Sequence, residues 1–145
     1  MFFRQEVERV ARIVTEDQPY SWKVPAAIAI LESGWGKTLR APFNVTNMKY
    51  YPTMWQQGGK VLTVSEEDGP EQSAFVVYRN LEHCLQHLVD TFQYSRYYRE
   101  HTATAKRRIT GATIEFVDLN LIRAVKSYCT KPEWADRVIS VYEEL

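Results

Sequence analysis

The stretch that decides the fold is Val24-Pro25-Ala26-Ala27-Ile28-Ala29-Ile30-Leu31-Glu32-Ser33-Gly34-Trp35-Gly36. Its proline suits the first turn of a helix, where the missing N–H costs nothing. The positions that follow are apolar on every side, which predicts a helix buried all round. The two glycines end that helix. A short buried helix that ends in a carboxylate, Glu32, is the most informative local feature of the chain.

The position of Glu32 suits acid chemistry. Cleavage of a glycosidic bond needs a carboxylic acid that is still protonated near neutral pH, whereas a solvated glutamate is ionised there. Three features oppose ionisation: the apolar helix, the negative end of the helix dipole, and Trp35 as a nearby apolar wall. The alternative is an ordinary solvated glutamate at a helix end.

The segments around this helix predict further helices and a small sheet. Apolar residues at helical spacing predict a helix over about residues 3–16. Residues 40–59 lack periodicity and predict a structured loop. Residues 60–64 and 73–78 predict two strands, with a turn over residues 66–70 between them.

The C-terminal half predicts more helices. An apolar stripe over residues 81–92 predicts a helix that Asn80 caps. We expect a basic, aromatic connector over residues 96–108, followed by helices over about 112–128 and 132–144. The last helix carries Trp134 inward as a core residue. The predicted fold class is α+β, mostly helical, with a small β-hairpin lobe.

Length and composition favour one globular domain. The chain has 145 residues, is 45% hydrophobic and has a formal net charge of zero. We expect a single domain over residues 1–145, with no nucleic-acid partner and no membrane span. The charged N-terminus is not a signal peptide, so the export route is open.

Neither the cysteines nor the histidines predict a special site. Two cysteines do not make a disulfide framework, and Cys84 lies on the apolar face of a predicted helix, where a buried free thiol is expected. A Cys84–Cys129 bridge stays open. His83 and His87 could face one side of a helix, but no third ligand has suitable spacing, so no metal or cofactor is expected.

Four segments in order resemble one enzyme family. Leu31–Gly36 resembles A-L-E-S-G-W-G, residues 44–49 resemble N-L-F-G-I-K, residues 75–78 resemble F-R-V-Y, and residues 128–135 resemble Y-A-T-D-P-x-Y-A. These are the motifs of the flagellar-muramidase and autolysin type of endo-β-N-acetylglucosaminidase, glycoside hydrolase family 73. The matches span about residues 25–145.

The sequence departs from this pattern at several positions. Asn47 stands where the family has glycine, which is tolerable because asparagine adopts positive φ more readily than most residues. Thr46 replaces an apolar residue. Lys131 and Trp134 replace aspartate and tyrosine in the last motif. None of these changes removes a proposed catalytic group.

The resemblance implies a lysozyme-like fold and a set of site residues. Glu32 would be the catalytic acid, and Tyr128 would line the site beside it. A second acid is expected on the hairpin, with Glu66 the best match and Glu67 its competitor; a solvated acidic turn is the alternative. The implied mechanism is retaining, inverting or assisted by the acetamido group of the substrate.

Four further residues are candidates for contact with sugar. Trp35 and Trp55 offer faces for stacking, although aromatic residues also fill small cores. Asn44 and Asn47 are expected to shape their loop and are candidates for substrate binding.

The implied function is hydrolysis of the β-1,4 bond after N-acetylglucosamine in peptidoglycan of the bacterial cell wall, by a monomer. The alternatives are a muramidase or lytic transglycosylase on the same fold, and a catalytically inactive glycan-binding module. A bacteriolytic toxin effector also fits, and such a toxin would need a protein inhibitor, or immunity protein, in the producing cell. The expected place of action is the cell wall or periplasm.

Overall fold

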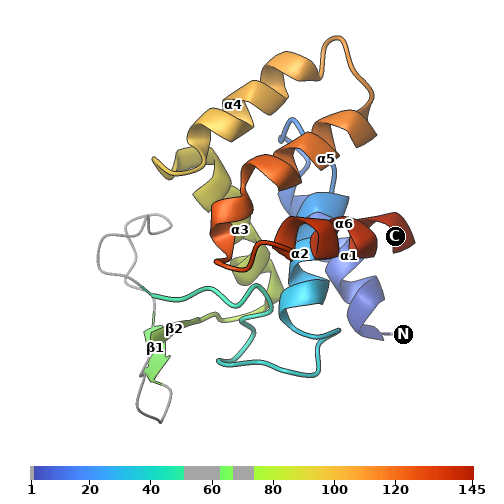
Figure 1. The fold of residues 1–145 in the computed structure, drawn as a ribbon. Helices are drawn as coiled ribbons and strands as arrows, with labels where there is room; N and C mark the ends of the chain where they lie inside the picture. Colours follow the sequence, from blue (N-terminus) through green and yellow to red (C-terminus); the bar gives the residue numbers. More distant parts are fainter. Residues whose placement is uncertain (1, 51–62, 67–73) are drawn as a thin grey trace.

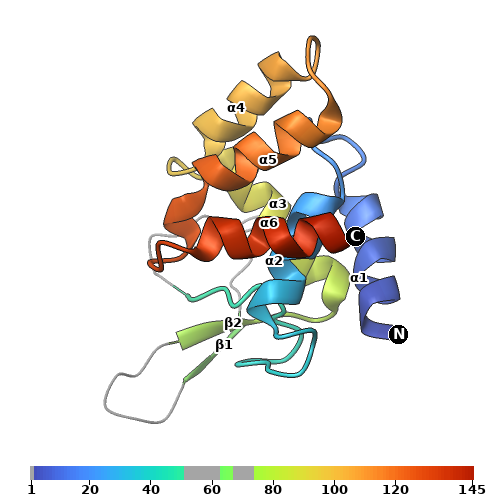
Figure 2. The ribbon, with the colours of Figure 1, turned by 45° about the vertical axis from the view of Figure 1, so that its right-hand side comes forward.

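The structure, a computed structural model, describes the backbone of residues 2–50, 63–66 and 74–145 (Figure 1). It also describes the side chains of residues 3–50 and 74–145. Most of this part of the chain is helical. The two chain ends lie on the same side of the molecule, and the two strands project from the helices on another side (Figures 1 and 2).

Helix α2 (Lys23–Glu32) lies at the centre of the helices, as predicted. Its residues from Val24 to Ile30 are all buried, and Pro25 lies in its first turn. Four helices pack against it: α1 (Phe2–Val14), α3 (Leu81–Tyr94), α5 (Ile114–Ala124) and α6 (Trp134–Glu144). The helix that carries Glu32 is therefore fixed by the whole helical core.

The predicted N-terminal helix and the helix after Asn80 are confirmed. Helix α1 buries Val7, Val10 and Val14 against the core. At the start of α3, the Asn80 Oδ1 atom accepts a hydrogen bond from the backbone N–H of His83 at 2.8 Å. This is the N-cap that the sequence predicts.

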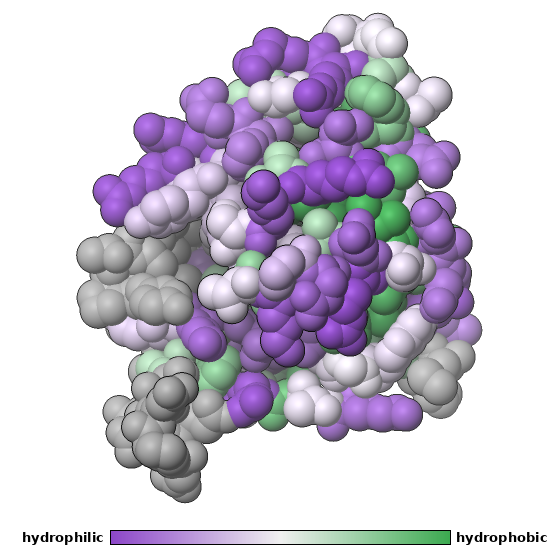
Figure 3. All heavy atoms as spheres, in the orientation of Figure 1, coloured by the Kyte–Doolittle hydropathy of each residue, from purple (hydrophilic) through white to green (hydrophobic). Residues whose placement is uncertain are grey.

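The expected connector over residues 96–108 is wrong, because Arg99–Arg108 forms helix α4. Only Thr102 and Ala105 of this helix are buried, so it has almost no apolar periodicity for a sequence pattern to detect. The Thr102 Oγ1 atom donates to the Phe92 carbonyl at 2.6 Å and ties α4 to α3. Figure 3 shows hydrophilic side chains over the upper part of the molecule, where Figure 1 places α4.

The last two predicted helices are shorter than expected. Helix α5 ends at Ala124, and a separate 3₁₀ helix, η2 (Lys126–Tyr128), follows it. Helix α6 begins at Trp134 instead of Pro132. The break after Ala124 turns the chain, and this turn places Tyr128 beside α6.

Strands β1 (Thr63–Glu66) and β2 (Ala74–Val77) pair antiparallel. The turn predicted over residues 66–70 does not begin at Glu66, because the backbone of Glu66 pairs with Ala74 in the sheet. The remainder of that turn, residues 67–70, lies outside the described residues. A bridge between Lys49 and Phe75 joins the segment before residue 51 to the other side of β2.

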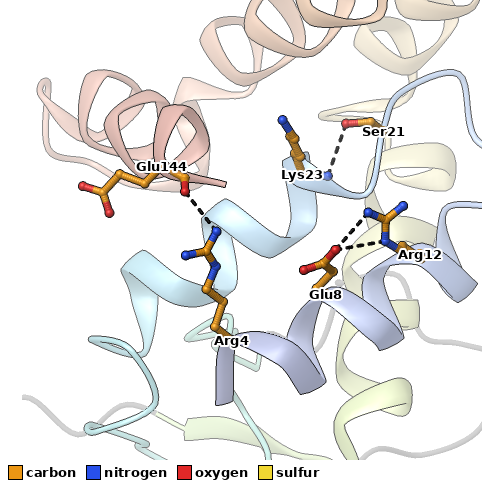
Figure 4. A network of polar contacts seen from close by, with 6 residues as sticks. All are labelled: Arg4, Glu8, Arg12, Ser21, Lys23 and Glu144. Atoms are coloured by element: carbon orange, nitrogen blue, oxygen red, sulfur yellow. Dashed lines mark hydrogen bonds and ion pairs between the residues drawn. The ribbon is translucent and has the colours of Figure 1, made fainter. Parts of the chain in front are cut away.

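Figure 4 shows polar contacts within α1 and from α1 to α6. The Arg4 guanidinium donates to the backbone carbonyl of Glu144 at 3.0 Å, which ties α1 to the end of α6. Arg12 forms an ion pair with Glu8 at 2.9 Å within α1. Because both side chains of this pair are exposed, it contributes at most about 1 kcal/mol.

Two general properties of the described residues complete the fold. No helix among them combines the length and the apolar character that crossing a membrane requires. Cys84 is buried, as predicted, and both Cys84 and Cys129 are free thiols. Burial raises the pKa of the Cys84 thiol to about 11, so this thiol stays protonated near neutral pH.

Candidate active site

Glu32 is the last residue of α2, and a Schellman motif ends the helix directly after it. The Gly34 N–H donates to the Leu31 carbonyl at 3.1 Å, and the Trp35 N–H donates to the Ile30 carbonyl at 2.9 Å. Gly34 adopts a left-handed conformation with φ of 55°, as this motif requires. The predicted stop after Glu32 is therefore confirmed, and it holds the carboxylate at a rigid helix end.

Ser33 fastens the turn that follows Glu32. Its hydroxyl donates to the Ala29 carbonyl at 2.6 Å and accepts from the Gly36 N–H at 3.0 Å. Ser33 is 1% exposed, so both hydrogen bonds lie inside the protein. The serine of the motif thus connects α2 with the glycine three residues later.

The backbone of this turn is strained at Trp35. Trp35 has φ of 61° between two glycines that also have positive φ. A bulky residue in this region is a genuine outlier. Such strain persists where the surroundings impose it, and it clusters at functional sites. The half-buried Trp35 side chain packs against the hydrophobic core.

The Glu32 carboxylate contacts the first residue of α6. The Trp134 indole Nε1–H donates to Glu32 Oε1 at 2.7 Å. The Glu32 side chain is half-buried, and no lysine or arginine among the described residues forms an ion pair with it. The burial of Trp134 confirms the prediction that it is a core residue. Its hydrogen bond to Glu32 was not predicted from the sequence.

Tyr128 lies beside the same tryptophan, so the structure brings it close to Glu32. The Tyr128 and Trp134 rings stack with centroids 5.4 Å apart at 25°. The Tyr128 hydroxyl donates to the Thr46 carbonyl at 2.5 Å. Burial, and then the nearby Glu32 charge, raise the Tyr128 pKa well above its ordinary value. The hydroxyl therefore stays protonated and remains a hydrogen-bond donor.

Asn44 organises the loop that supplies the Thr46 carbonyl. Its Nδ2 atom donates to the carbonyls of Met48 and Val76, both at 2.9 Å, and its Oδ1 atom accepts from the Met48 N–H at 2.9 Å. Because Asn44 is 2% exposed, these bonds favour the loop-shaping interpretation. Asn47 has φ of 56°, the positive φ that an asparagine in place of glycine predicts.

The remaining predicted site residues lie on or beyond β1. Glu66 is the last residue of β1, and its backbone pairs with Ala74. Glu67 and Trp55 lie outside the described residues. The choice between Glu66 and Glu67 as second acid therefore stays a prediction.

The two histidines of α3 make separate contacts. His87 Nδ1 lies 2.5 Å from the Tyr78 hydroxyl in the core, whereas His83 Nδ1 accepts from the Arg79 N–H at 3.2 Å at the helix start. Within the residues described, no group of three or more histidine, cysteine or acidic side chains is arranged to hold a metal ion.

The arrangement combines an acid with fixed donors. One half-buried carboxylate sits at a rigid helix end, held by one indole N–H, with a protonated phenol close by. Trp134 could have been identified as a site residue from its place in the motif of residues 128–135, which also contains Tyr128. A pattern of apolar positions cannot show that a buried indole also donates a hydrogen bond.

Solved structures share this fold. The glycoside hydrolase domain of FlgJ from Salmonella typhimurium is 22% identical with a TM-score of 0.70, over 98% of this chain and 85% of that chain. A peptidoglycan hydrolase from Sphingomonas sp. A1 is 20% identical with a TM-score of 0.70, over 96% and 86%. The catalytic domain of the autolysin Auto from Listeria monocytogenes is 15% identical with a TM-score of 0.69, over 99% and 82%. These likenesses confirm the mostly helical, lysozyme-like fold.

The sequence itself also matches a family. No curated protein sequence matches the chain. Residues 10–145 match the Glucosaminidase family, described as mannosyl-glycoprotein endo-beta-N-acetylglucosaminidase. The match includes the Schellman turn with Glu32 and both aromatic residues beside it. The resemblance found in the four motifs is thereby confirmed: this chain belongs to the Glucosaminidase family of glycoside hydrolases.

Proposed function

We propose that this chain hydrolyses the β-1,4 bond that follows N-acetylglucosamine in peptidoglycan, with Glu32 as the general acid. The observation that carries the proposal is the position of Glu32 at a fixed helix end within a family match that spans residues 10–145. Peptidoglycan as the substrate is supported by the similar enzymes from Sphingomonas sp. A1 and Listeria monocytogenes, a peptidoglycan hydrolase and an autolysin.

Glu32 would protonate the leaving oxygen of the scissile bond. Its carboxylate is half-buried and has no ion-pair partner in the described part of the chain. The hydrogen bond from Trp134 leaves the second carboxylate oxygen available for the substrate. Positioned general acid catalysis contributes about 10²–10⁴-fold to the rate.

Glu66, the last residue of β1, would be the second acid. It would activate water or stabilise positive charge on the sugar ring. A separation of about 6.5–9.5 Å between the two carboxylates would make the enzyme inverting, and about 5–5.5 Å retaining. Participation by the substrate acetamido group is the third mechanism.

Aromatic and amide side chains would bind the sugars. Tyr128 would line the site beside the reacting centre, with its hydroxyl directed to the Thr46 carbonyl. Trp35 and Trp55 would stack on sugar rings. Asn47 would contact the glycan from the loop that Asn44 shapes.

Digestion of purified peptidoglycan sacculi tests this function. After borohydride reduction, mass spectrometry of the fragments identifies the sugar at each new reducing end. The proposal predicts reduced N-acetylglucosamine ends. Reduced N-acetylmuramic acid ends would show a muramidase, 1,6-anhydro ends a lytic transglycosylase, and no fragments a binding module.

A second substrate tests the activity that the description of the family names. A high-mannose glycoprotein contains the bond that a mannosyl-glycoprotein glucosaminidase would cleave. We expect the chain to leave this glycoprotein intact while it digests sacculi. Release of the high-mannose glycan with intact sacculi would overturn the proposed substrate but not the assignment of Glu32.

A further inference from the structure

We infer that Trp134 is a positioning residue that holds one oxygen of the Glu32 carboxyl group, so that the proton is delivered from the other. The inference rests on the proposed function of Glu32 as the general acid. It assigns a role to a residue that the sequence pattern explains fully as core.

The contact is short and enclosed. The Trp134 Nε1–H donates to Glu32 Oε1 at 2.7 Å, and Trp134 is 3% exposed. Water therefore has little access to the indole side of this hydrogen bond. An indole N–H is a donor only, so it can neither take up nor release the catalytic proton.

The donor fixes where the catalytic proton resides. The carbonyl oxygen of a carboxylic acid is a better acceptor than its hydroxyl oxygen, so the oxygen that faces the indole is the carbonyl one. The acidic proton is then held on Oε2, the oxygen that Trp134 does not bind. In the catalytic step Glu32 gives this proton to the leaving oxygen and becomes a carboxylate. The indole bond to Oε1 strengthens as that charge forms.

Trp134 is itself held in place by a second contact. Its ring stacks on Tyr128, with centroids 5.4 Å apart, and the Tyr128 hydroxyl donates to the Thr46 carbonyl at 2.5 Å. Thr46 is 0% exposed. A continuous series of contacts therefore runs from the loop around Thr46 through two aromatic rings to the acid.

The identity of the side chain decides how this contact behaves. The resembling family motif has a tyrosine where Trp134 stands. A phenol donates, accepts and titrates, whereas an indole only donates. With tryptophan, the hydrogen bond to the acid has one direction at every pH.

Kinetics on soluble, peptide-free glycan strands test the role. Trp134→Phe keeps an aromatic ring and removes the donor. We expect kcat to fall about tenfold while KM stays within about twofold, because the loss is felt in the reaction and not in binding. The matched control is Tyr142→Phe, which removes a donor from the same helix whose acceptor is Asp118, at 2.8 Å. We expect this control to keep its kcat per folded molecule.

The indole N–H resonances give a readout that does not depend on activity. In ¹H–¹⁵N spectra of the folded protein, the resonance lost in Trp134→Phe identifies Trp134. Glu32→Gln should move that resonance further than those of Trp22 and Trp35. An active wild type whose Trp134→Phe variant keeps its kcat, or a Trp134 resonance that Glu32→Gln leaves in place, overturns this inference alone. A wild type inactive on all glycans overturns the proposed function, whatever the spectra show.

Discussion

Glu32 and Asp118 are both carboxylates that the protein shields from water at least in part, and they differ in the number of hydrogen bonds that each accepts. Asp118 is 0% exposed and accepts hydrogen bonds from the Ser21 N–H at 2.8 Å, the Ser21 hydroxyl at 2.5 Å and the Tyr142 hydroxyl at 2.8 Å. Glu32 is half-buried and accepts one, from Trp134. Asp118, with three donors, joins elements of the fold, whereas Glu32, with one donor, retains an oxygen for substrate.

Asp118 predicts a pH dependence of stability. Burial raises its pKa above the ordinary 3.8, against the hydrogen bonds from Ser21 and Tyr142. Between 3.8 and the raised pKa the folded state binds more protons than the unfolded state, so the free energy of unfolding falls as pH rises through this window. Asp118→Asn removes the titration and should flatten this decline. Urea unfolding across the window measures it, and an unchanged slope in the variant would contradict the argument.

Tyr128→Phe should affect both stability and turnover. A role in the site alone would predict lost turnover at constant melting temperature, but the hydroxyl donates to the carbonyl of buried Thr46. Leaving that carbonyl without its donor costs about 1–3 kcal/mol of unfolding free energy. We also expect lower kcat per folded molecule. Tyr97→Phe is the control, because Tyr97 is 64% exposed. Wild-type turnover at a lowered melting temperature would make Tyr128 structural only.

At the scale of elements, the sequence predicted those helices that bury a clear stripe or carry a cap. Helices α1, α2 and α3 follow from apolar spacing, the proline in the first turn of α2, and the Asn80 side chain. Helix α4 could not be predicted from the sequence pattern, because it buries only Thr102 and Ala105 and is held by packing on α3 and α5. Tertiary contacts outweighed local pattern there.

The candidate site was predictable where one motif carried it. The E-S-G-W-G stretch located Glu32 and its helix end, and the last motif located Tyr128. The hydrogen bond from Trp134 was not predictable, since it joins residues 102 positions apart through the packing of α6 on α2. Single-sequence patterns contain no information on such a contact.

Gly36→Ala tests the turn that holds Glu32. Gly36 has φ of 82°, and an added Cβ would lie 2.6 Å from the Phe3 ring. We expect a loss of about 2 kcal/mol or more in the free energy of unfolding. The matched control is Gly111→Ala, since a Cβ at Gly111 meets nothing within 4 Å. Equal losses in the two variants, measured in urea, would show that the turn tolerates a side chain.

Substitution of two neighbouring carboxylates tests which of them is the second acid. Glu66→Gln should cost much more activity than Glu67→Gln, because Glu66 is the better match to the second acid of the family pattern. Initial rates on soluble glycan strands compare them, with circular dichroism to confirm folding. Near-normal rates in both variants would mean a solvated acidic turn and a mechanism that depends on the substrate acetamido group.

At the scale of the whole molecule, the two proposed acids belong to different parts of the fold. Glu32 stands at the end of the central helix α2, whereas Glu66 ends a strand that projects from the helices (Figure 1). Helices α1, α3, α5 and α6 fix the first, and pairing of β1 with β2 holds the backbone of the second.

The central claim, that Glu32 is the catalytic acid, is tested by the activity of Glu32→Gln on purified peptidoglycan. Glutamine is nearly isosteric and can still accept from the Trp134 N–H, but it cannot deliver a proton. We predict a loss of about 10²–10⁴-fold in the initial rate, with an unchanged circular dichroism spectrum and melting temperature. A folded Glu32→Gln protein that keeps more than about a tenth of the wild-type rate would contradict the account.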